Sequence, residues 1–313
     1  MAVGLGRREL ASSLLAVASL PSPLTPASPS VGLLPPAVTF GVQIYDDATA
    51  ERLTLQALSV GFRSFFTSPE GGNQLGFARA IAQSGVPREQ LYIAGSVLSD
   101  VSLGERPARL ETARACAESR AVLAAGGVES LDMLLLERPG GSRASILGQW
   151  SGLRELTRGR ALLLTVREVR EAGWARALGV SNFELTELDY LLGQSDPPLL
   201  NQIGLSLGTT GFSHTALLGA HKARGVALQA NRPLAGGGER FSSGMKEACA
   251  AIGAPRGKTA QQVALRWLVQ QGVGFCIHST STGHLREALA VEGFAISEGE
   301  IARLSALARE PLV

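Results

Sequence analysis

In ARALGVSNF, residues 175–183, the β-rich run ARALGVS (175–181) ends at Ser181 and is followed by Asn182 and Phe183. It is one of eight short β-rich runs along the chain, and helical patterns separate them. The other runs are VTFGVQI (38–44), GFRSFFT (61–67), LYIAGSV (91–97), LDMLLLE (131–137), LLNQIGL (199–205), VALQANRP (226–233) and GFCIHST (274–280). Strands that alternate with helices predict a parallel sheet, and eight such units predict a closed (β/α)8 TIM barrel. The chemistry of such a barrel lies at the carboxyl ends of its strands.

The segments between these runs have the apolar spacing of amphipathic helices. ATAERLTLQALSV (48–60) is one such segment, and TAQQVALRWLVQQG (259–272) is another. In the second, apolar residues recur at i, i+3, i+4, i+7 and i+8, namely at Ala260, Val263, Ala264, Trp267 and Leu268. This period near 3.6 predicts a helix with one face packed on the barrel.

Length and composition fit one large domain. The chain has 313 residues, of which 45% are hydrophobic and 18% charged, so it can bury a large core. A net charge of +2 gives no reason to expect nucleic acid or an anionic membrane as partner. Cys116, Cys249 and Cys276 are far apart and lack metal-ligand spacing. We expect them to be small buried apolar residues, and we predict no metal site.

Residues 1–36 differ from the rest of the chain. Arg7 and Arg8 precede the apolar run LASSLLAVASL, which contains the small-residue triplet Ala16-Val17-Ala18. These features are typical of a cleavable targeting segment, and the run is too short to span a bilayer. We expect 1–36 to be a targeting segment or a disordered tail, and 37–313 to be the barrel. Cleavage would accompany delivery to an organelle such as a plastid, or export; a mere tail would leave the protein cytoplasmic.

Several strand-end motifs resemble the aldo-keto reductase superfamily. They are GVSNF (179–183), Asn201-Gln202, Pro233-Leu234, GKTAQQVALRW (257–267) and Ser279 with Glu287. Their order and spacing are similar to the family's from about Phe40 onward, and the two longer motifs are specific when they occur together. The resemblance implies a single (β/α)8 barrel, NADP(H) as cofactor, and a small carbonyl or alkene substrate.

In that family the Ser and Asn of the SNF motif, with a later Gln, bind the nicotinamide carboxamide. The matching positions here are Ser181, Asn182 and Gln202. An amide ligand needs both hydrogen-bond donors and acceptors, and these side chains supply both at a barrel mouth. Polar capping of the strand ends is the alternative interpretation.

The stretch after the eighth strand departs from the family. In the family this stretch resembles I-P-K-S-x-x-x-x-R-x-x-E-N, whose Lys, Ser and Arg lie around the adenosine 2′-phosphate. In this chain it reads CIHSTSTGHLREA. His278 and His284 stand at the Lys and Arg positions, while Ser279 and Glu287 are retained. Neutral imidazoles donate hydrogen bonds but lack the fixed charge of Lys and Arg. We expect weaker 2′-phosphate binding, with NAD as an alternative cofactor. Two surface histidines without a ligand are the other interpretation.

The proton-transfer positions differ most. The family's G-Y-R-H-I-D-T-A-x-x-Y-x-N-E reads GFRSFFTSPEGGNQ here, which places Phe66 at the Asp and Gly71 at the catalytic Tyr. Ser96 stands at the Lys position and Glu137, in DMLLLERP, at the His position. Hydride delivery to a carbonyl needs a proton donor, and general acid catalysis supplies about 10²–10⁴ in rate. We therefore expect standard carbonyl reduction to be lost or greatly weakened.

Glu137 is the one candidate substitute for the missing acid. A carboxyl group in a water-poor barrel mouth is able to act as a proton donor. Pairing of Glu137 with Arg138 or Arg63 is the alternative, and Ser96 is then a small strand residue. Two functions stay open: a divergent NADP(H)-dependent oxidoreductase, and a regulatory pseudoenzyme that binds nicotinamide cofactor without turnover.

A last departure lies between Trp150 and Gly173. The stretch TRGRALLLTVREVREAG adds about three helical turns compared with the family. It either lengthens the fourth helix of the outer ring or reflects an error in the gene model. It lies away from the mouth, so we expect it to have no catalytic role.

Overall fold

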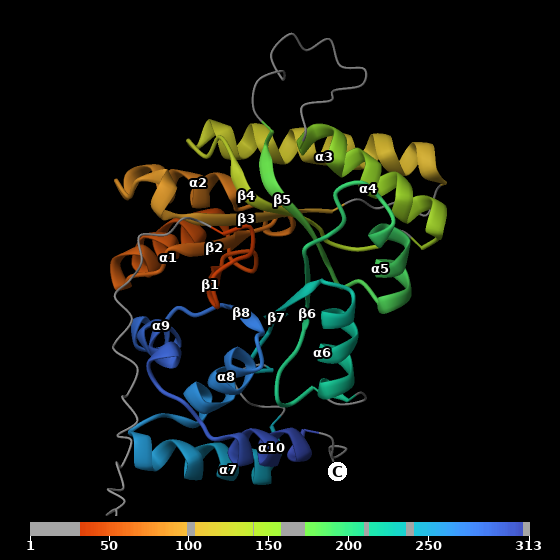
Figure 1. The fold of residues 1–313 in the computed structure, drawn as a ribbon. Helices are drawn as coiled ribbons and strands as arrows, with labels where there is room; N and C mark the ends of the chain where they lie inside the picture. Colours follow the sequence, from red (N-terminus) through yellow and green to blue (C-terminus); the bar gives the residue numbers. More distant parts are fainter. Residues whose placement is uncertain are drawn as a thin grey trace, which may run out of the picture. The chain divides into compact units, whose positions relative to one another are not determined.

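Eight parallel strands close into a barrel in the order β1 to β8 (Figure 1). The strands are β1 (Val38–Gly41), β2 (Ser64–Thr67), β3 (Tyr92–Val97), β4 (Leu131–Leu136), β5 (Ala175–Ser181), β6 (Leu200–Gly204), β7 (Ala227–Asn231) and β8 (Gly274–Ile277). Each of the eight predicted runs contains one of them. The barrel closes where β8 pairs with β1, with Phe275 opposite Val38. The predicted (β/α)8 fold is confirmed.

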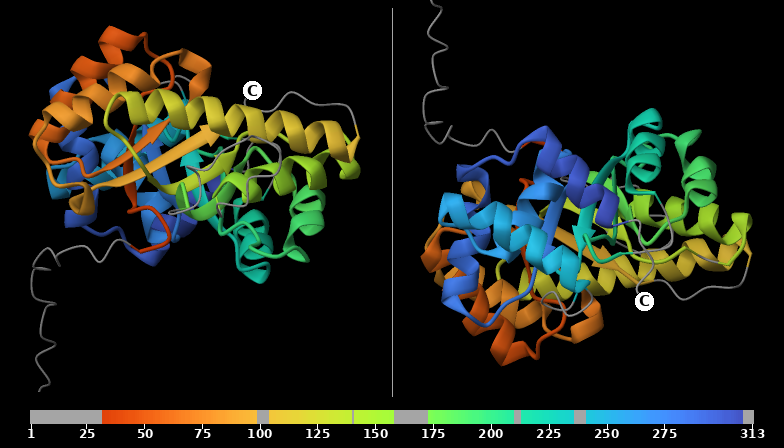
Figure 2. Two further views of the ribbon diagram at one scale, coloured as in Figure 1. Left: turned by 90° about the horizontal axis from the view of Figure 1, so that it is seen from above. Right: turned by 90° about the horizontal axis from the view of Figure 1, so that it is seen from below.

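Helices surround the strands in all three views (Figures 1 and 2). They are α1 (Asp47–Val60), α2 (Gln74–Gln83), α3 (Glu105–Ala125), α4 (Arg143–Thr157), α5 (Leu185–Leu192), α6 (His214–Ala223), α7 (Ser243–Gly253), α8 (Ala260–Gln270), α9 (Thr282–Leu289) and α10 (Glu298–Leu307). The two helical segments predicted from apolar spacing are α1 and α8. The start of α8 is fixed by a capping box between Thr259 and Gln262. Among the helices described here, none is both long and apolar enough to cross a bilayer.

The computed structural model describes residues 32–98, 104–139, 141–157, 173–209, 213–235 and 241–308. Residues 1–31 of the predicted targeting segment lie outside this set, and so do residues 158–172 of the additional stretch before β5. The predictions for these two segments therefore stay predictions.

Two apolar layers hold the barrel together. Side chains alternate across each strand, so Phe65 of β2 points outward to the helices and its neighbour Phe66 points inward. The inner layer is small and consists of Phe66, Tyr92, Ala94, Met133, Leu135, Ala177, Leu200 and Cys276. The three cysteines are buried, as predicted: Cys276 inside the barrel, Cys116 and Cys249 in the outer layer.

A line of polar side chains also crosses the barrel interior. Gln202 Nε2 donates to Gln229 Oε1 at 2.8 Å, and Gln229 Nε2 donates to Thr39 Oγ1 at 3.1 Å. Thr39 Oγ1 in turn lies 2.8 Å from Ser64 Oγ. All four residues are buried, and buried polar groups need partners. These bonds fix Gln202 from below, at the carboxyl end of β6.

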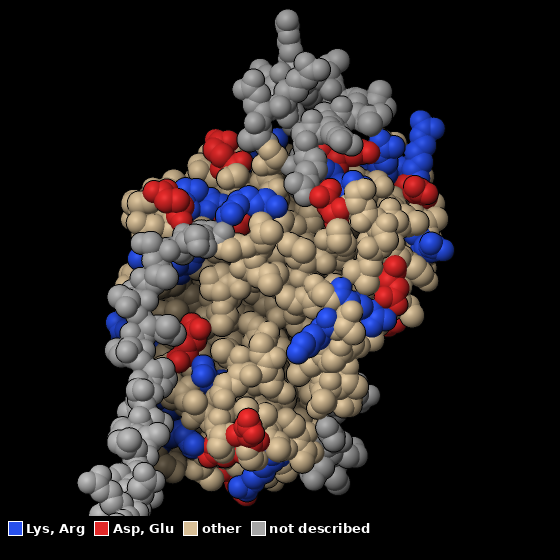
Figure 3. Space-filling model, in the orientation of Figure 1, with Lys and Arg blue, Asp and Glu red and all other residues tan. Residues whose placement is uncertain are grey.

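Charged side chains pair on the outside of the barrel. Arg79 of α2 lies 2.6 Å from Asp47 and 2.8 Å from Glu51, both on α1. On the face drawn in Figure 3, Lys and Arg side chains lie next to Asp and Glu, and uncharged side chains cover most of the rest. Exposed ion pairs contribute only about 0–1 kcal/mol each, so the packed layers carry the fold.

Helices α3 and α4 approach unusually closely, and two glycines permit it. Gly148 and Gly152 lie on one face of α4, four residues apart. A Cβ atom at position 148 would lie 2.0 Å from the carbonyl oxygen of Glu105, and one at position 152 would lie 2.3 Å from that of Arg109. The two helix backbones therefore touch where only glycine fits.

We predict that Gly148→Ala destabilises the protein, although alanine is normally the better helix former. The added methyl group overlaps a backbone atom of α3, and overpacking of this kind costs about 1–3 kcal/mol. Gly219→Ala on α6 is the matched control, because a Cβ there meets nothing within 4 Å. It should gain about 0.5–1 kcal/mol in urea unfolding. Equal free energies of unfolding for the two variants would contradict the close contact.

Candidate active site

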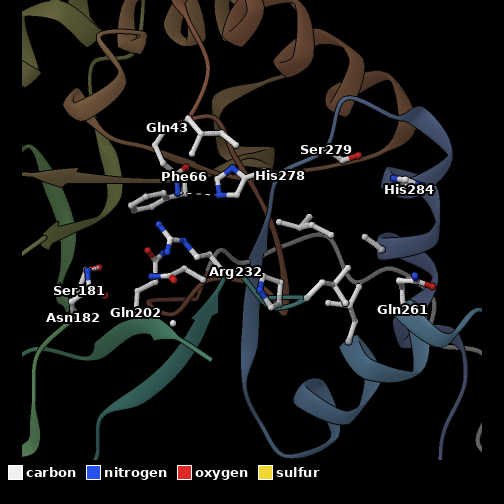
Figure 4. A pocket seen from close by; sticks show the side chains of 18 of the residues that line it. Gln43, Phe66, Ser181, Asn182, Gln202, Arg232, Gln261, His278, Ser279 and His284 are labelled. Atoms are coloured by element: carbon white, nitrogen blue, oxygen red, sulfur yellow. Dashed lines mark hydrogen bonds between the residues drawn. The ribbon is translucent and has the colours of Figure 1, made fainter. Parts of the chain in front are cut away.

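A cavity of about 770 Å³ lies at the carboxyl ends of the strands (Figure 4). Its size falls within the range of about 300–1,000 Å³ that is usual for small-molecule sites. All the residues predicted for the site line it: Glu137, Ser181, Asn182, Gln202, His278, Ser279, His284 and Glu287. In Figure 4, Ser181, Asn182 and Gln202 form one end, which we call the amide end, and Ser279 and His284 lie at the opposite, α9 end.

Strand pairing creates the amide end. Ser181 is the last residue of β5 and lies opposite Gln202 of β6. Asn182 follows with a φ of 62°, and its backbone N–H donates to the Gln202 carbonyl at 2.9 Å. Asparagine tolerates this left-handed conformation better than most residues. In this conformation Asn182 Nδ2 donates a hydrogen bond to Ser181 Oγ at 3.1 Å.

Glu137 follows β4 beside the amide end. Its Oε2 atom accepts hydrogen bonds from Ser96 Oγ at 2.5 Å and from Ser68 Oγ at 2.9 Å. Asn182 Nδ2 lies 3.4 Å from the backbone oxygen of Glu137. Glu137 is only 9% exposed and lines the cavity. Ser96 therefore has a specific partner in addition to its place in the strand.

The arginine partners considered for Glu137 lie elsewhere. Arg138 pairs with Glu70 at 3.0 Å, and Arg63 donates to two backbone carbonyl groups. The two serine hydroxyls, not an arginine, hold the Glu137 carboxyl group. The interpretation of Glu137 as half of a surface ion pair is therefore wrong.

The space at Gly71 is filled by backbone. A Cβ atom there would lie 2.5 Å from the carbonyl oxygen of Gln43 and 2.6 Å from Asn73 Nδ2. The loop that carries Gln43 is held in place because Asn73 Nδ2 donates to Val42 O at 2.8 Å and to Tyr45 O at 2.5 Å. The family resemblance assigns a tyrosine to this position, and here the glycine is closely packed. A side chain at position 71 fits only if the β1–α1 loop moves.

Phe66 stands at the position that the family resemblance assigns to an Asp. Its ring is 2% exposed and belongs to the apolar layer inside the barrel, and it also lines the cavity. The position therefore contributes an apolar wall to the cavity, with no group that exchanges a proton.

His278 lies in the middle of the cavity and uses both ring nitrogens (Figure 4). Nδ1 lies 3.0 Å from the carbonyl oxygen of Gly41, which only accepts, so Nδ1 carries the proton. Nε2 then accepts from Gln43 Nε2 at 3.2 Å. Burial lowers the pKa of His278, and the positive charge of Arg232 lowers it further, against the opposing effect of the Gly41 bond. A neutral His278 fits these contacts.

The α9 end is more open. His284 is exposed, and its backbone N–H lies 3.4 Å from Oγ of Ser281, the residue that caps α9. Ser279 Oγ accepts from the backbone N–H of Ser281 at 3.1 Å. Glu287 Oε2 accepts from Thr259 Oγ1 at 3.2 Å and so links α9 to the start of α8. The predicted roles of His278, His284, Ser279 and Glu287 toward a phosphate stay predictions.

Two cavity residues escaped the sequence analysis. Arg232 follows β7 with a φ of 50°, and Figure 4 shows its side chain extending into the cavity toward the amide end. Among the described residues no acidic side chain pairs with it. Its place at the end of a strand was the signal that could have found it. Gln43 has a buried Oε1 without a partner, and its role depends on the fold around His278, which no local pattern encodes.

Comparisons with known proteins agree with this architecture. The sequence profile described as "Aldo/keto reductase family" matches residues 37–309. The chain is 31% identical over 273 residues to an aldo-keto reductase of Mycolicibacterium vanbaalenii, covering 87% of this chain and 88% of that protein. It is 28% identical to the 9,11-endoperoxide prostaglandin H2 reductase of Trypanosoma cruzi, covering 87% of each chain.

A solved structure shows the same fold. The aldo/keto reductase of Brucella melitensis superposes with a TM-score of 0.71 at 23% identity, covering 87% of this chain and 94% of that one. The chain belongs to the aldo/keto reductase family. Members of this family are oxidoreductases that generally use nicotinamide cofactors and carbonyl substrates.

We predict that Gly71→Ala destabilises the protein by about 1–3 kcal/mol, because the methyl group overlaps the Gln43 carbonyl. Urea unfolding measures the effect. Gly244→Ala, at an exposed glycine of α7 where a Cβ meets nothing within 4 Å, is the control and should not lose stability. A Gly71→Ala protein as stable as the wild type would mean that the β1–α1 loop yields freely and that position 71 accepts a side chain.

Proposed function

We propose that the cavity binds a nicotinamide dinucleotide with its carboxamide at the amide end, and that the protein is an NADP(H)-linked oxidoreductase with weak or lost carbonyl reduction. The observation that carries this is the convergence of Ser181, Asn182 and Gln202 at one end of a cavity of about 770 Å³. Family membership supports the cofactor class, and the Phe66 and Gly71 positions support the loss of standard chemistry.

The donor set of the amide end fits a carboxamide. Gln202 Nε2 is engaged with Gln229, which leaves Oε1 to accept from an amide N–H. Ser181 Oγ accepts from Asn182, so its own hydroxyl proton is available to donate to an amide oxygen. The same end therefore offers the Gln202 acceptor and the Ser181 donor that a primary carboxamide requires, and Asn182 Oδ1 is a further acceptor, because among the described residues only Nδ2 of that amide is engaged.

A bound nicotinamide supplies or accepts hydride, and the chain must supply the proton. Glu137 is the titratable group that we assign to this role. Its Oε2 atom already accepts two hydroxyl hydrogens, so a proton on the carboxyl group would reside on Oε1. Ser96 and Ser68 hold the group in place. The proton donor is thus moved from the family's tyrosine position to the end of β4.

The residues at the positions where the family binds the 2′-phosphate give only weak support for NADP as the preferred cofactor. His278 is engaged with Gly41 and Gln43 in the form of a neutral ring, and His284 is exposed. Neither supplies the fixed charge that selects a 2′-phosphate. We infer that NAD also binds. Arg232 is a fixed cation in the cavity and suits an anionic group of the cofactor or of a substrate.

A second candidate function is a cofactor-binding regulatory protein without turnover. Phe66 and the filled space at Gly71 favour it, because neither position can transfer a proton.

For residues 1–36 we propose a cleavable targeting segment that directs the barrel to an organelle or out of the cell; a plain tail would leave it in the cytoplasm.

We predict measurable NADPH binding that weakens in Ser181→Ala and in Asn182→Gly. Glycine removes the amide but keeps the positive φ of Asn182, so the turn itself is preserved. Each loss should be about threefold to tenfold, the range of one hydrogen bond. Fluorescence titration measures it, with Gln194→Ala, an exposed amide outside the cavity, as control. A wild-type protein that binds neither NADPH nor NADH at millimolar concentration would refute the proposal.

We predict little aldehyde reduction by the wild-type protein with saturating NADPH, and a further loss in Glu137→Gln of about 10²-fold, the lower range for removal of a general acid. Glu70→Gln, which also lines the cavity but is exposed and paired with Arg138, is the control. NADPH oxidation at 340 nm with aldehydes and activated alkenes is the assay.

Three outcomes separate the candidate functions. Reduction abolished by Glu137→Gln would exclude the regulatory protein without turnover. Robust reduction unaffected by Glu137→Gln would show that the proton comes from elsewhere and contradict the assigned role. Cofactor binding without turnover of any substrate would favour the regulatory function.

A further inference from the structure

Behind the amide end, the side chain of Asn201 acts as a clamp on the chain. Its Nδ2 atom donates to the backbone oxygen of Phe183 at 2.8 Å, and its Oδ1 atom lies 3.4 Å from the backbone N–H of the same residue. Phe183 directly follows Ser181 and Asn182. On the other side, the Asn182 N–H is held by Gln202 O at 2.9 Å. The turn 181–183 is therefore fixed at both ends by β6.

His221 of α6 fixes the clamp. Its Nε2 atom lies 3.2 Å from Asn201 Nδ2, and its Nδ1 atom lies 2.9 Å from the carbonyl oxygen of Leu217. A carbonyl only accepts, so Nδ1 carries the proton and Nε2 accepts from Asn201. Asn201 is fully buried and His221 is 2% exposed, so water does not compete for either group.

These contacts define one orientation of the Asn201 amide. One Nδ2 hydrogen goes to Phe183 and the other to His221, while Oδ1 faces the Phe183 N–H. A flipped amide would place Oδ1 against the Phe183 carbonyl, acceptor against acceptor. A protonated His221 would place an N–H against the Nδ2 hydrogens, donor against donor. Only neutral His221 keeps the clamp intact.

We propose that His221 is a positioning residue for the cofactor: through Asn201 it holds the turn 181–183 in the shape that presents Ser181 and Asn182 to the carboxamide. The proposal rests on the proposed cofactor role of that turn. The turn needs such support, because Asn182 is held at a φ of 62°, in the left-handed region that is uncommon for residues other than glycine, even though asparagine tolerates it better than most.

The surroundings of His221 keep it neutral. Burial lowers its pKa below the ordinary 6.5, and Arg224 lowers it further, while the Leu217 bond opposes both. Lys222 is the adjacent charge on α6, and Asp189 of α5 is engaged with Arg224 at 2.7 Å. Strands β6 and β7, which read LNQIG and ALQAN, contribute no ionisable group.

The sign of the pH effect follows. The turn is intact at neutral pH, and it loosens when the pH falls below 6.5 far enough to protonate His221 in the folded protein. The histidine contribution to stability is lost in the same direction, because the unfolded chain binds this proton first. His278 lines the cavity itself, so the pH dependence of cofactor binding alone does not isolate His221.

Hydrogen–deuterium exchange of the cofactor-free full chain isolates the contribution of His221. At neutral pH, His221→Leu should speed the exchange of the 182 and 183 amides by about threefold to tenfold, the range of one lost hydrogen bond. His221→Gln should stay near the wild type, because a glutamine oxygen can replace Nε2 as acceptor. His214→Gln is the matched control: His214 is on the same helix, equally buried, and bonded to Ser206 O instead.

NADPH titrations at pH about 8 and about 5.5, on either side of the ordinary histidine pKa, form the second arm. Wild-type affinity should fall at the lower pH, and His221→Gln should reduce that fall while His278→Gln reports the contribution of the cavity histidine. Equal exchange at 182 and 183 in His221→Leu and wild type would overturn the proposal. Faster exchange in His221→Leu with no cofactor binding by the wild type would uphold the clamp and refute the cofactor role.

Discussion

Gln202 is the residue on which the geometry of the site depends, because it is bonded in two directions. Its side chain donates downward to Gln229 in the barrel interior, and its backbone oxygen holds the N–H of Asn182 above. The first bond continues through Thr39 to Ser64. Since these groups are buried, the loss of any one of these hydrogen bonds leaves a polar atom without a partner, which costs about 1–3 kcal/mol. The mouth of the barrel is thus anchored to its interior.

The residues proposed to bind the cofactor and the positions assigned to proton transfer are held by different contacts. The amide end is a turn clamped by Gln202 and Asn201, and it keeps the residues that the family resemblance implied. The positions that the resemblance assigns to proton transfer hold an apolar ring at Phe66 and, beside the amide end, the Glu137 carboxyl group held by serines. As we propose it, the same barrel combines a retained cofactor site with altered residues for proton transfer.

Much of this was predictable because it depends on local patterns. Strand β5 matches its predicted run residue for residue, and the position of Ser181 at its end follows from the alternation of strands and helices. Glu137, Ser181, Asn182, Gln202 and His278 could be found because they lie in or just after strands, whereas His284 and Glu287 of α9 were assigned by the family resemblance. The partners of Glu137 were not, since Ser68 reaches it only after β2 and β4 take their places in the barrel. The contact between Gly71 and Gln43 joins residues 28 positions apart, and no local sequence pattern at either residue indicates it.

The backbone behind Gly71 also limits which residues evolution can place at that position. Any single change to a larger residue at that position meets the Gln43 carbonyl, which Asn73 holds in place through the neighbouring loop. A larger side chain at position 71 therefore requires two changes, a shift of the β1–α1 loop and replacement of the glycine. As long as the loop keeps this position, the route by single substitutions to a tyrosine at position 71 is closed.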